Sequence, residues 1–180
     1  MQETQKFLAK NNEEVILRPA VPEDAAAIIK TIKSTSLERS YVLMEQYGKN
    51  ADSEKEYIRM ADCEKCLLLV ATAHDEVVGS LAALQADGGD NPQTAHILKI
   101  GLHLREAYRG LGIGSQMLQY TTDWARERRF KKLEASIFTT NKRSLHLFSR
   151  AGFQEEGTRR KRLWVGNEYI DEVLLGKVME

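Results

Sequence analysis

The chain lacks an excess of charge of either sign. Its 180 residues carry 26 Lys plus Arg and 26 Asp plus Glu, so the formal net charge is zero. A protein that binds nucleic acid or membrane surfaces through charge would show a basic excess. The composition therefore argues against both partners, and the length predicts one domain, residues 1–180, with a core of its own.

Long apolar runs are missing too. The longest, Cys66 to Ala73, is far too short to cross a bilayer, and Met1 to Lys6 has no apolar segment typical of a secretion signal. No repeat, linker or low-complexity segment interrupts the chain. We therefore expect a cytoplasmic protein without a membrane partner.

Cysteine is scarce, and Cys63 and Cys66 form a lone C-x-x-C. Zinc would need a second pair or suitably spaced histidines, which are not nearby. A thioredoxin-like pair would begin a helix, whereas Cys66 opens a strand-like run. We expect two buried or half-buried free thiols and no metal.

The most informative stretch is Arg109-Gly110-Leu111-Gly112-Ile113-Gly114-Ser115, which leads into a helical pattern. Each glycine costs about 1 kcal/mol relative to alanine inside a helix, so its presence needs a reason. Glycines let a ligand approach bare backbone, and the free N–H groups of a first helical turn favour an anion. We interpret residues 109–115 as a cradle for a pyrophosphate.

Two common phosphate-binding loops do not fit this stretch. A P-loop needs a Lys-Ser or Lys-Thr pair after the glycines, and a dinucleotide fingerprint needs a glycine where Ser115 stands. Glu134 falls near the distance expected for a ribose-binding acid, but it lies inside a predicted strand rather than at its end. A nucleotide-binding α/β protein remains a rival interpretation.

Hydrophobic periodicity predicts the order β-α-α-β-β-β-α-β-α-β-β, a mixed sheet with helices on its faces. Residues 1–13 are expected to be frayed or a short lead-in, and Ser53 is the expected N-cap of the second helix. The predicted strands cover 14–18, 66–73, 77–84, 96–104, 133–138, 153–164 and 169–178, and the helices begin at residues 22, 53, 113 and 141.

The predicted strand 96–104 has two different faces. His96 falls on an apolar face with alternate leucine and isoleucine residues, and we expect it in the core. Lys99, Gly101 and His103 fall on the other, mixed face. This mixed face is where a ligand is expected to lie against the sheet.

A second motif follows the predicted strand 133–138. Asn141-Lys142-Arg143-Ser144-Leu145-His146-Leu147-Phe148-Ser149-Arg150-Ala151-Gly152-Phe153 matches N-x-x-[SA]-x-x-[LF]-[YF]-x-x-x-G-F. Together with R-G-x-G-x-G at 109–114, it resembles the acetyl-coenzyme A signature of the GNAT (general-control-related N-acetyltransferase) superfamily. Gly166 to Asp171 resembles the G-x-x-Y-x-D of members that act on small amines and proteins. The resemblance covers about residues 14–178 and is clearest over 96–171.

The resemblance implies an α/β fold with a central mixed sheet and transfer of an acetyl group from acetyl-CoA to a primary amine. A small-molecule acceptor is favoured over a protein N-terminus or lysine. Backbone groups of Leu102 to Leu104 would pair with the pantetheine where two strands splay, and an N–H there would polarise the thioester carbonyl. Asn141 would bind the pantetheine or cap its helix. The implied cofactor-binding residues are Leu102, His103, Leu104, Arg109, Gly110, Leu111, Gly112, Ile113, Gly114, Ser115 and Asn141.

The sequence departs from the family at two catalytic positions. Phe148 stands where a tyrosine often serves as the acid for the thiolate, and Lys99 stands where a glutamate often acts as the base. His103 is a candidate base near neutral pH, with a solvent-facing strand histidine as the alternative. Tyr169 is a candidate acid, with a core or rim tyrosine as the alternative. Because of these two departures, a coenzyme A-binding module without turnover is an alternative function for this chain.

The acceptor pocket is expected from residues 35–48 and the final hairpin. Glu38, Tyr41 and Glu45 are the candidate acceptor-binding residues, and Glu172 is a further candidate to hold an ammonium group. The basic run Arg159 to Arg162 is expected at a solvated strand edge. A homodimer is a candidate assembly, because dimers are common among similar proteins.

Overall fold

The computed structural model describes residues 4–36 and 50–180, and these form one eight-stranded sheet in the order β1-β2-β3-β4-β5-β6-β8-β7. Neighbouring strands are antiparallel except β5 and β6, which are parallel. The predicted mixed sheet flanked by helices is confirmed. The strands are β1 (Gln5–Leu8), β2 (Glu14–Pro19), β3 (Cys66–Ala73), β4 (Glu76–Gln85), β5 (Ile97–Leu104), β6 (Lys132–Phe138), β7 (Gln154–Val165) and β8 (Glu168–Val178), and the α-helices are α1 (Ala25–Ser36), α2 (Ala51–Met60), α3 (Ile113–Glu127) and α4 (Lys142–Arg150).

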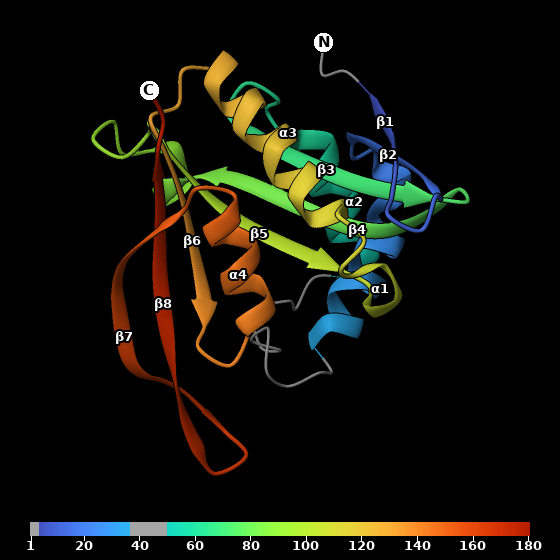
Figure 1. Cartoon of the computed structure of the whole chain (residues 1–180). Coiled ribbons are helices and arrows are strands. Elements are labelled where there is room, and N and C mark those ends of the chain that lie inside the picture. Colours follow the sequence, from blue (N-terminus) through green and yellow to red (C-terminus); the bar gives the residue numbers. More distant parts are fainter. Residues whose placement is uncertain (1–3, 37–49) are drawn as a thin grey trace.

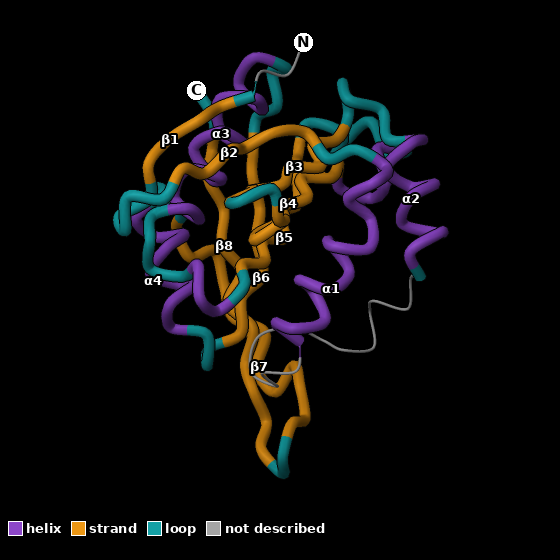
Figure 2. The backbone as a smooth tube through the Cα atoms, turned by 90° about the vertical axis from the view of Figure 1, so that its right-hand side faces the viewer, coloured by secondary structure: helices purple, strands orange, loops and turns teal. Residues whose placement is uncertain are grey.

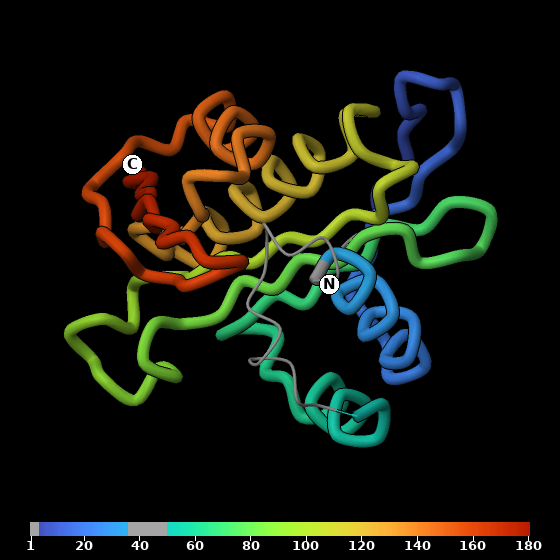
Figure 3. Tube along the Cα trace, turned by 90° about the horizontal axis from the view of Figure 1, so that it is seen from below, coloured from blue at the N-terminus to red at the C-terminus, as the bar shows by residue number. Residues whose placement is uncertain are grey.

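The helices cover the sheet from both sides. Figures 2 and 3 show α1 and α2 on one face and α3 and α4 on the other. The larger core includes the apolar stripe of α3, in which Ile113 and Met117 are fully buried, and a smaller cluster joins α1 and α2 to β3 and β4. The apolar run of β3 is therefore covered on both faces, as its composition predicted.

The first helix is fixed by a charged pair at its start. Asp24 accepts hydrogen bonds from both terminal nitrogens of Arg18, at 2.7 and 2.9 Å, and from the backbone N–H of Val21 at 2.8 Å. The bidentate pair joins β2 to the single 3-10 turn Pro22–Asp24 that precedes α1. This joint sets the position of α1 over the sheet.

The structure corrects two predicted element boundaries. Residues 5–8, expected to be frayed, form β1 and pair antiparallel with β2. Helix α2 is capped by Asn50 rather than Ser53, since the Asn50 side chain accepts hydrogen bonds from both the N–H and the hydroxyl of Ser53, at 2.8 and 2.9 Å. Asn50 and Ser53 are both good capping residues, so the composition alone did not decide between them.

Two burial predictions were also wrong. Cys63 is exposed, whereas Cys66 is half-buried as expected, and neither forms a disulfide within the described residues. His96 lies just before β5 and is exposed rather than in the core. The parity of the strand did not place His96, because the regular strand begins one residue later.

The two parallel strands stay together for only a short distance. Pairing of β5 with β6 is confined to Ile97–Lys132, Leu98–Leu133 and Lys99–Glu134. Beyond these pairs β5 remains on β4 as far as Leu104, and β6 remains on β8 as far as Phe138. Figure 1 shows the two strands running apart from their shared end. Within the described residues, no strand lies beside the β6-facing edge of β5 from Ile100 to Leu104.

The hairpin of β7 and β8 extends well beyond the body of the molecule (Figure 1).

No helix in the parts that the structure describes, 4–36 and 50–180, is both long and apolar enough to span a membrane.

Gly79 of β4 provides a test of the packing around β5. A Cβ at Gly79 would overlap the side chain of Leu104 and lie 3.2 Å from the carbonyl oxygen of His103. Gly79→Val is expected to lower the free energy of unfolding by about 1–3 kcal/mol in urea denaturation. The control is Gly157→Val, because a Cβ at Gly157 of β7 meets nothing within 4 Å, and a change under about 0.5 kcal/mol is expected there. Equal losses of unfolding free energy in the two variants would contradict close packing of Gly79 against β5.

Candidate active site

The glycine turn forms an open, left-handed stretch of backbone before α3. Gly110 and Gly112 have φ of +76° and +90°, a region that other residues adopt only with strain, and a Cβ at either would meet nothing within 4 Å. Gln116 N–H donates to the carbonyl of Gly112, so the N–H groups of residues 113–115 precede the hydrogen-bond ladder of α3. The turn therefore presents bare backbone at the positive end of the helix dipole, together with donors that have no backbone partner among the described residues, as an anion site requires.

The third glycine of the motif serves packing. A Cβ at Gly114 would lie 2.9 Å from Leu147 Cδ2 and 3.3 Å from Leu104 Cδ1, so its absence lets α3 approach both α4 and the end of β5. The Ile113 side chain points into the core and is fully buried. The interpretation that all three glycines clear space for a ligand is thus corrected for Gly114.

A cleft of about 320 Å³ brings the two sequence motifs together. It lies between the glycine turn, the end of β5 and one face of α4. Of the predicted cofactor-binding residues, three do not line it: His103 lies on the opposite face of β5, Ile113 is in the core, and Leu111 turns its carbonyl to the N–H of Lys10 at 3.1 Å. Those that do line it are Leu102, Leu104, Arg109, Gly110, Gly112, Gly114, Ser115 and Asn141.

Two of these side chains fix the walls of the cleft. Arg109 Nε donates to the carbonyl oxygen of Leu104 at 2.9 Å, which ties the glycine turn back to the end of β5. Asn141 caps α4 by accepting a hydrogen bond from Ser144 N–H at 3.0 Å. Both residues are therefore held in place before any ligand arrives.

The cleft also holds basic residues that the sequence did not single out. Lys10, Arg143 and Arg150 line it together with His146. The spacing of residues 143, 146 and 150 places them on one face of a helix, a signal available from the motif itself. Lys10 was not predictable in the same way, because it reaches the cleft only through the turn between β1 and β2. These groups add positive charge around the glycine turn.

His103 is not solvent-facing, so that alternative is wrong. It projects from the face of β5 covered by α1 and α2, where its Nδ1 is buried with no hydrogen-bond partner among the described residues. Burial lowers the pKa of His103 from 6.5 to about 4. The imidazole is therefore neutral at physiological pH and has a free acceptor nitrogen or a free N–H, depending on the tautomer.

The other residues at candidate or expected catalytic positions do not line the cleft. Tyr169 is 59% exposed near the end of the hairpin, where its ring packs against Trp164 with centroids 4.6 Å apart. Phe148 is buried and meets Phe153 edge to face at 5.0 Å. Lys99 is exposed and lies 3.9 Å from Asp87. The structure does not bring Tyr169, Phe148 or Lys99 together with His103.

The acceptor-binding candidates Glu38, Tyr41 and Glu45 lie outside the described residues. Glu172 is buried, and its carboxylate lies 2.9 Å from Arg159 and 3.4 Å from Arg162. Its charge is thus already compensated by two arginines. The basic run itself is exposed along β7, as expected.

The site combines a splayed pair of parallel strands with an open glycine turn, as the resemblance to GNAT acetyltransferases implies, and comparisons with known proteins agree. The model of the acetyltransferase (GNAT) family matches residues 36–153. The L-amino acid N-acetyltransferase AaaT of Escherichia coli (strain K12) is 27% identical over 124 residues, which make up 67% of this chain and 73% of AaaT.

Solved structures share the fold. A GNAT-family acetyltransferase from Streptococcus pneumoniae matches with a TM-score of 0.83 at 21% identity, covering 92% of this chain and 99% of its own. YncA from Salmonella typhimurium, solved with its cofactor acetyl-CoA, matches with a TM-score of 0.81 at 17% identity over 92% and 94% of the two chains. The chain belongs to the GNAT family and is an N-acetyltransferase.

The half-buried His103, with its buried Nδ1, predicts a loss of stability in mild acid. Its pKa of about 4 in the folded protein lies below the ordinary 6.5, so the unfolded chain takes up the proton first and stability falls as the pH drops through 6.5 towards 4. Between pH 7 and pH 5 this group alone should remove about 2 kcal/mol from the free energy of unfolding. Urea denaturation at the two pH values measures the loss, and His103→Asn should show a loss smaller by that amount. An identical pH dependence in the variant would contradict the burial of His103.

The basic face of α4 predicts a charge-dependent contribution to ligand binding. Arg143→Gln should weaken acetyl-CoA binding about 3- to 10-fold at low salt and less at high salt, because it removes a cation from the cleft. Calorimetry at two ionic strengths measures both effects. Lys142→Gln is the matched control, since Lys142 is the neighbouring cation on α4 but does not line the cleft. Equal weakening by the two substitutions would indicate a general charge effect.

Proposed function

We propose that this N-acetyltransferase transfers the acetyl group of acetyl-CoA to the primary amine of a small molecule. The observation that carries the proposal is the meeting, in one cleft, of the open glycine turn and the edge of β5 that no described strand covers. A phosphate-binding turn alone would fit many ligands. A free strand edge beside it suits a ligand that combines a pyrophosphate with an extended, amide-bearing arm.

The residues of the cleft fit acetyl-CoA. The N–H groups at the start of α3 and the cations Lys10, Arg143 and Arg150 suit its phosphates. The open Cβ positions of Gly110 and Gly112 leave room for them. The β5 edge from Leu102 to Leu104 suits the amides of the pantetheine arm, which would take the place of a neighbouring strand. That YncA was solved with acetyl-CoA supports the same assignment.

When bound, acetyl-CoA supplies a thioester that a neutral amine can attack. The part of this chain is to bind and orient the two reactants and to stabilise charge. A backbone N–H between Leu102 and Leu104 would donate to the thioester oxygen as negative charge develops there. His103, neutral and within the same segment of β5, is the candidate to accept a hydrogen bond from the amine. Phe148 has no hydroxyl group that could protonate the thiolate of coenzyme A. We therefore expect the thiolate to leave without an acid at this position.

A small acceptor is supported by the relative AaaT, which is named for acetylation of L-amino acids. The assay is release of free thiol from acetyl-CoA across alkylamines, polyamines, amino acids, aminoglycosides and short peptides. Release that depends on a small amine is expected. Binding of acetyl-CoA without thiol release in the presence of any of these amines would favour a non-catalytic coenzyme A-binding module.

Ser115 tests the cradle without endangering the fold. It is exposed in the first turn of α3 and lines the cleft. Ser115→Glu should weaken acetyl-CoA binding at least about 10-fold by placing a negative charge beside the pyrophosphate, while a first-turn acid stabilises the helix. The control is Gln119→Glu, one turn further on the exposed side of α3 and outside the cleft. Undiminished coenzyme affinity in Ser115→Glu would refute the cradle.

A further inference from the structure

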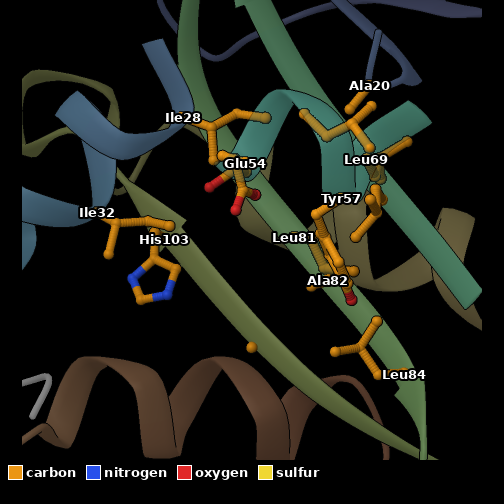
Figure 4. A pocket seen from close by; sticks show the side chains of 14 residues that line it. Ala20, Ile28, Ile32, Glu54, Tyr57, Leu69, Leu81, Ala82, Leu84 and His103 are labelled. Carbon is orange, nitrogen blue, oxygen red and sulfur yellow. The ribbon is translucent and has the colours of Figure 1, made fainter. Parts of the chain in front are cut away.

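A second pocket lies on the other face of the sheet, beneath α1 and α2. Its volume is about 150 Å³. Most of its wall is apolar, with Ile28 and Ile32 from α1, Ile58 from α2, and leucines from β3 and β4. Figure 4 shows Glu54 and His103 on the side of Ile28 and Ile32, with Tyr57 and Leu84 on the other side. An apolar cavity of this volume holds a molecule the size of benzene.

Ser80 Oγ and His103 Nδ1 are buried polar atoms in this pocket, and neither has a hydrogen-bond partner within the described residues. Ser80 is only 5% exposed. Ser80 and His103 stand directly opposite each other on β4 and β5, so their Cβ atoms are about 4.5–5.5 Å apart. A buried polar atom without a partner lowers the stability of the folded protein, and a ligand that satisfies both atoms would remove that cost.

The lining of the pocket favours an amine over an acid. Glu54 of α2 is 4% exposed and lines the pocket beside Tyr57, and no lysine or arginine lines it among the residues the structure describes. A carboxylate ligand would thus find no cation to pair with. A neutral amine needs no such partner.

The pocket is adjacent to the site where the thioester is expected. His103 belongs to the β5 segment Leu102 to Leu104, whose flanking leucines line the cofactor cleft on the opposite face. Helix α1 joins the two sites as well, because Ile28 and Ile32 line the pocket and Thr35, one turn further on, lines the cofactor cleft. A molecule held by His103 is therefore next to the free edge of β5.

We infer that this pocket binds the acceptor, and that the acceptor is a primary amine with an uncharged, apolar body of about phenyl size whose nitrogen is held by Ser80 and His103. The inference rests on the proposed acetyl transfer and narrows its substrate class. The apolar body fills the space beneath α1 and α2. The nitrogen lies at the polar end of the pocket, beside β5.

The hydrogen-bond count of a neutral amine fits this pair of acceptors. A primary amine has two N–H donors and one lone pair. Donation of one N–H to Ser80 Oγ and the other to His103 Nδ1 leaves the lone pair available for attack. Because the pocket is largely apolar, it also favours the neutral form of the amine, which is the reactive one.

The first experiment compares acceptors with the intact enzyme. Phenethylamine and 3-methylbutylamine should give kcat/KM values at least about 10-fold above those of putrescine and β-alanine, whose second charged group has no place in an apolar pocket. Thiol release that is faster with putrescine or β-alanine overturns the substrate class while leaving the transferase function intact. No release with any amine, with acetyl-CoA still bound, defeats the proposed function instead.

Binding without turnover is followed separately. Phenethylamine is titrated into the protein with coenzyme A present, and backbone amide shifts are recorded by NMR. Saturable shifts at Ser80 and His103 are expected. Saturable shifts elsewhere, with none at these two residues, overturn the assignment whether or not the enzyme turns over.

Ser80→Ala separates a ligand-binding hydroxyl from a structural one. KM for phenethylamine should rise about 3- to 10-fold, with unchanged acetyl-CoA affinity. Thermal stability should stay the same or rise, since the hydroxyl has no partner within the described residues. Thr72→Val is the control: it removes a buried hydroxyl from β3 outside both pockets, and its KM should not change. Lower stability with an unchanged KM in Ser80→Ala overturns the role of Ser80.

Ala82→Leu tests the size of the pocket. Ala82 of β4 lines the wall, so a leucine there would take space from the acceptor body. The kcat/KM ratio of phenethylamine to ethylamine should fall about 10-fold or more, and the ratio is insensitive to partial loss of folded enzyme. An unchanged ratio would show that the acceptor body lies elsewhere.

Discussion

The separation of β5 from β6 is the constraint on which the rest of the site depends. Three residue pairs join these parallel strands, whereas seven pairs hold β6 to β8 and seven hold β5 to β4. Each strand therefore follows its antiparallel neighbour, and the sheet opens between them. Within residues 4–36 and 50–180, the opening leaves backbone donors and acceptors without a strand beside them. Unsatisfied backbone groups of this kind are costly unless solvent or a ligand pairs with them. The glycine turn and the first turn of α3 follow directly at the end of β5.

The alternation of side chains along β5 then places different residues on its two faces. Leu102 and Leu104 face the cleft beside α3 and α4, while Gly101 and His103 face the pocket beneath α1 and α2. One short segment thereby contacts the cleft and the pocket at once, since successive side chains of a strand point to opposite faces. A shift of one residue in the register between β4 and β5 would exchange the side chains that face the cleft with those that face the pocket, and would destroy both sites.

The sequence was sufficient for the parts of the site that depend on local chemistry. The glycines at 110 and 112, the cap at Asn141 and the buried run of β3 all follow from conformational or hydrogen-bonding rules that act over a few residues. Burial of His103 could not be predicted in this way, because it depends on α1 and α2, which lie far away in sequence. The partnerless hydroxyl of Ser80 and the approach of Lys10 to the glycine turn likewise exist only through tertiary contacts. The strand β1 was not predictable from the sequence, because its residues are mostly exposed and carry no alternating apolar pattern.

The position of β8 has a consequence for how the molecule assembles. β8 lies between β6 and β7, although it follows both in the chain, so β6 acquires its main partner only after some thirty further residues have been made. During synthesis on the ribosome, β6 therefore has an open edge along most of its length while α4 and β7 emerge. Such an edge can pair with other chains, and a nascent chain in this state depends on prompt closure by β8 or on a chaperone. The strand order that opens the sheet for its ligand thus also makes completion of the sheet a late folding event.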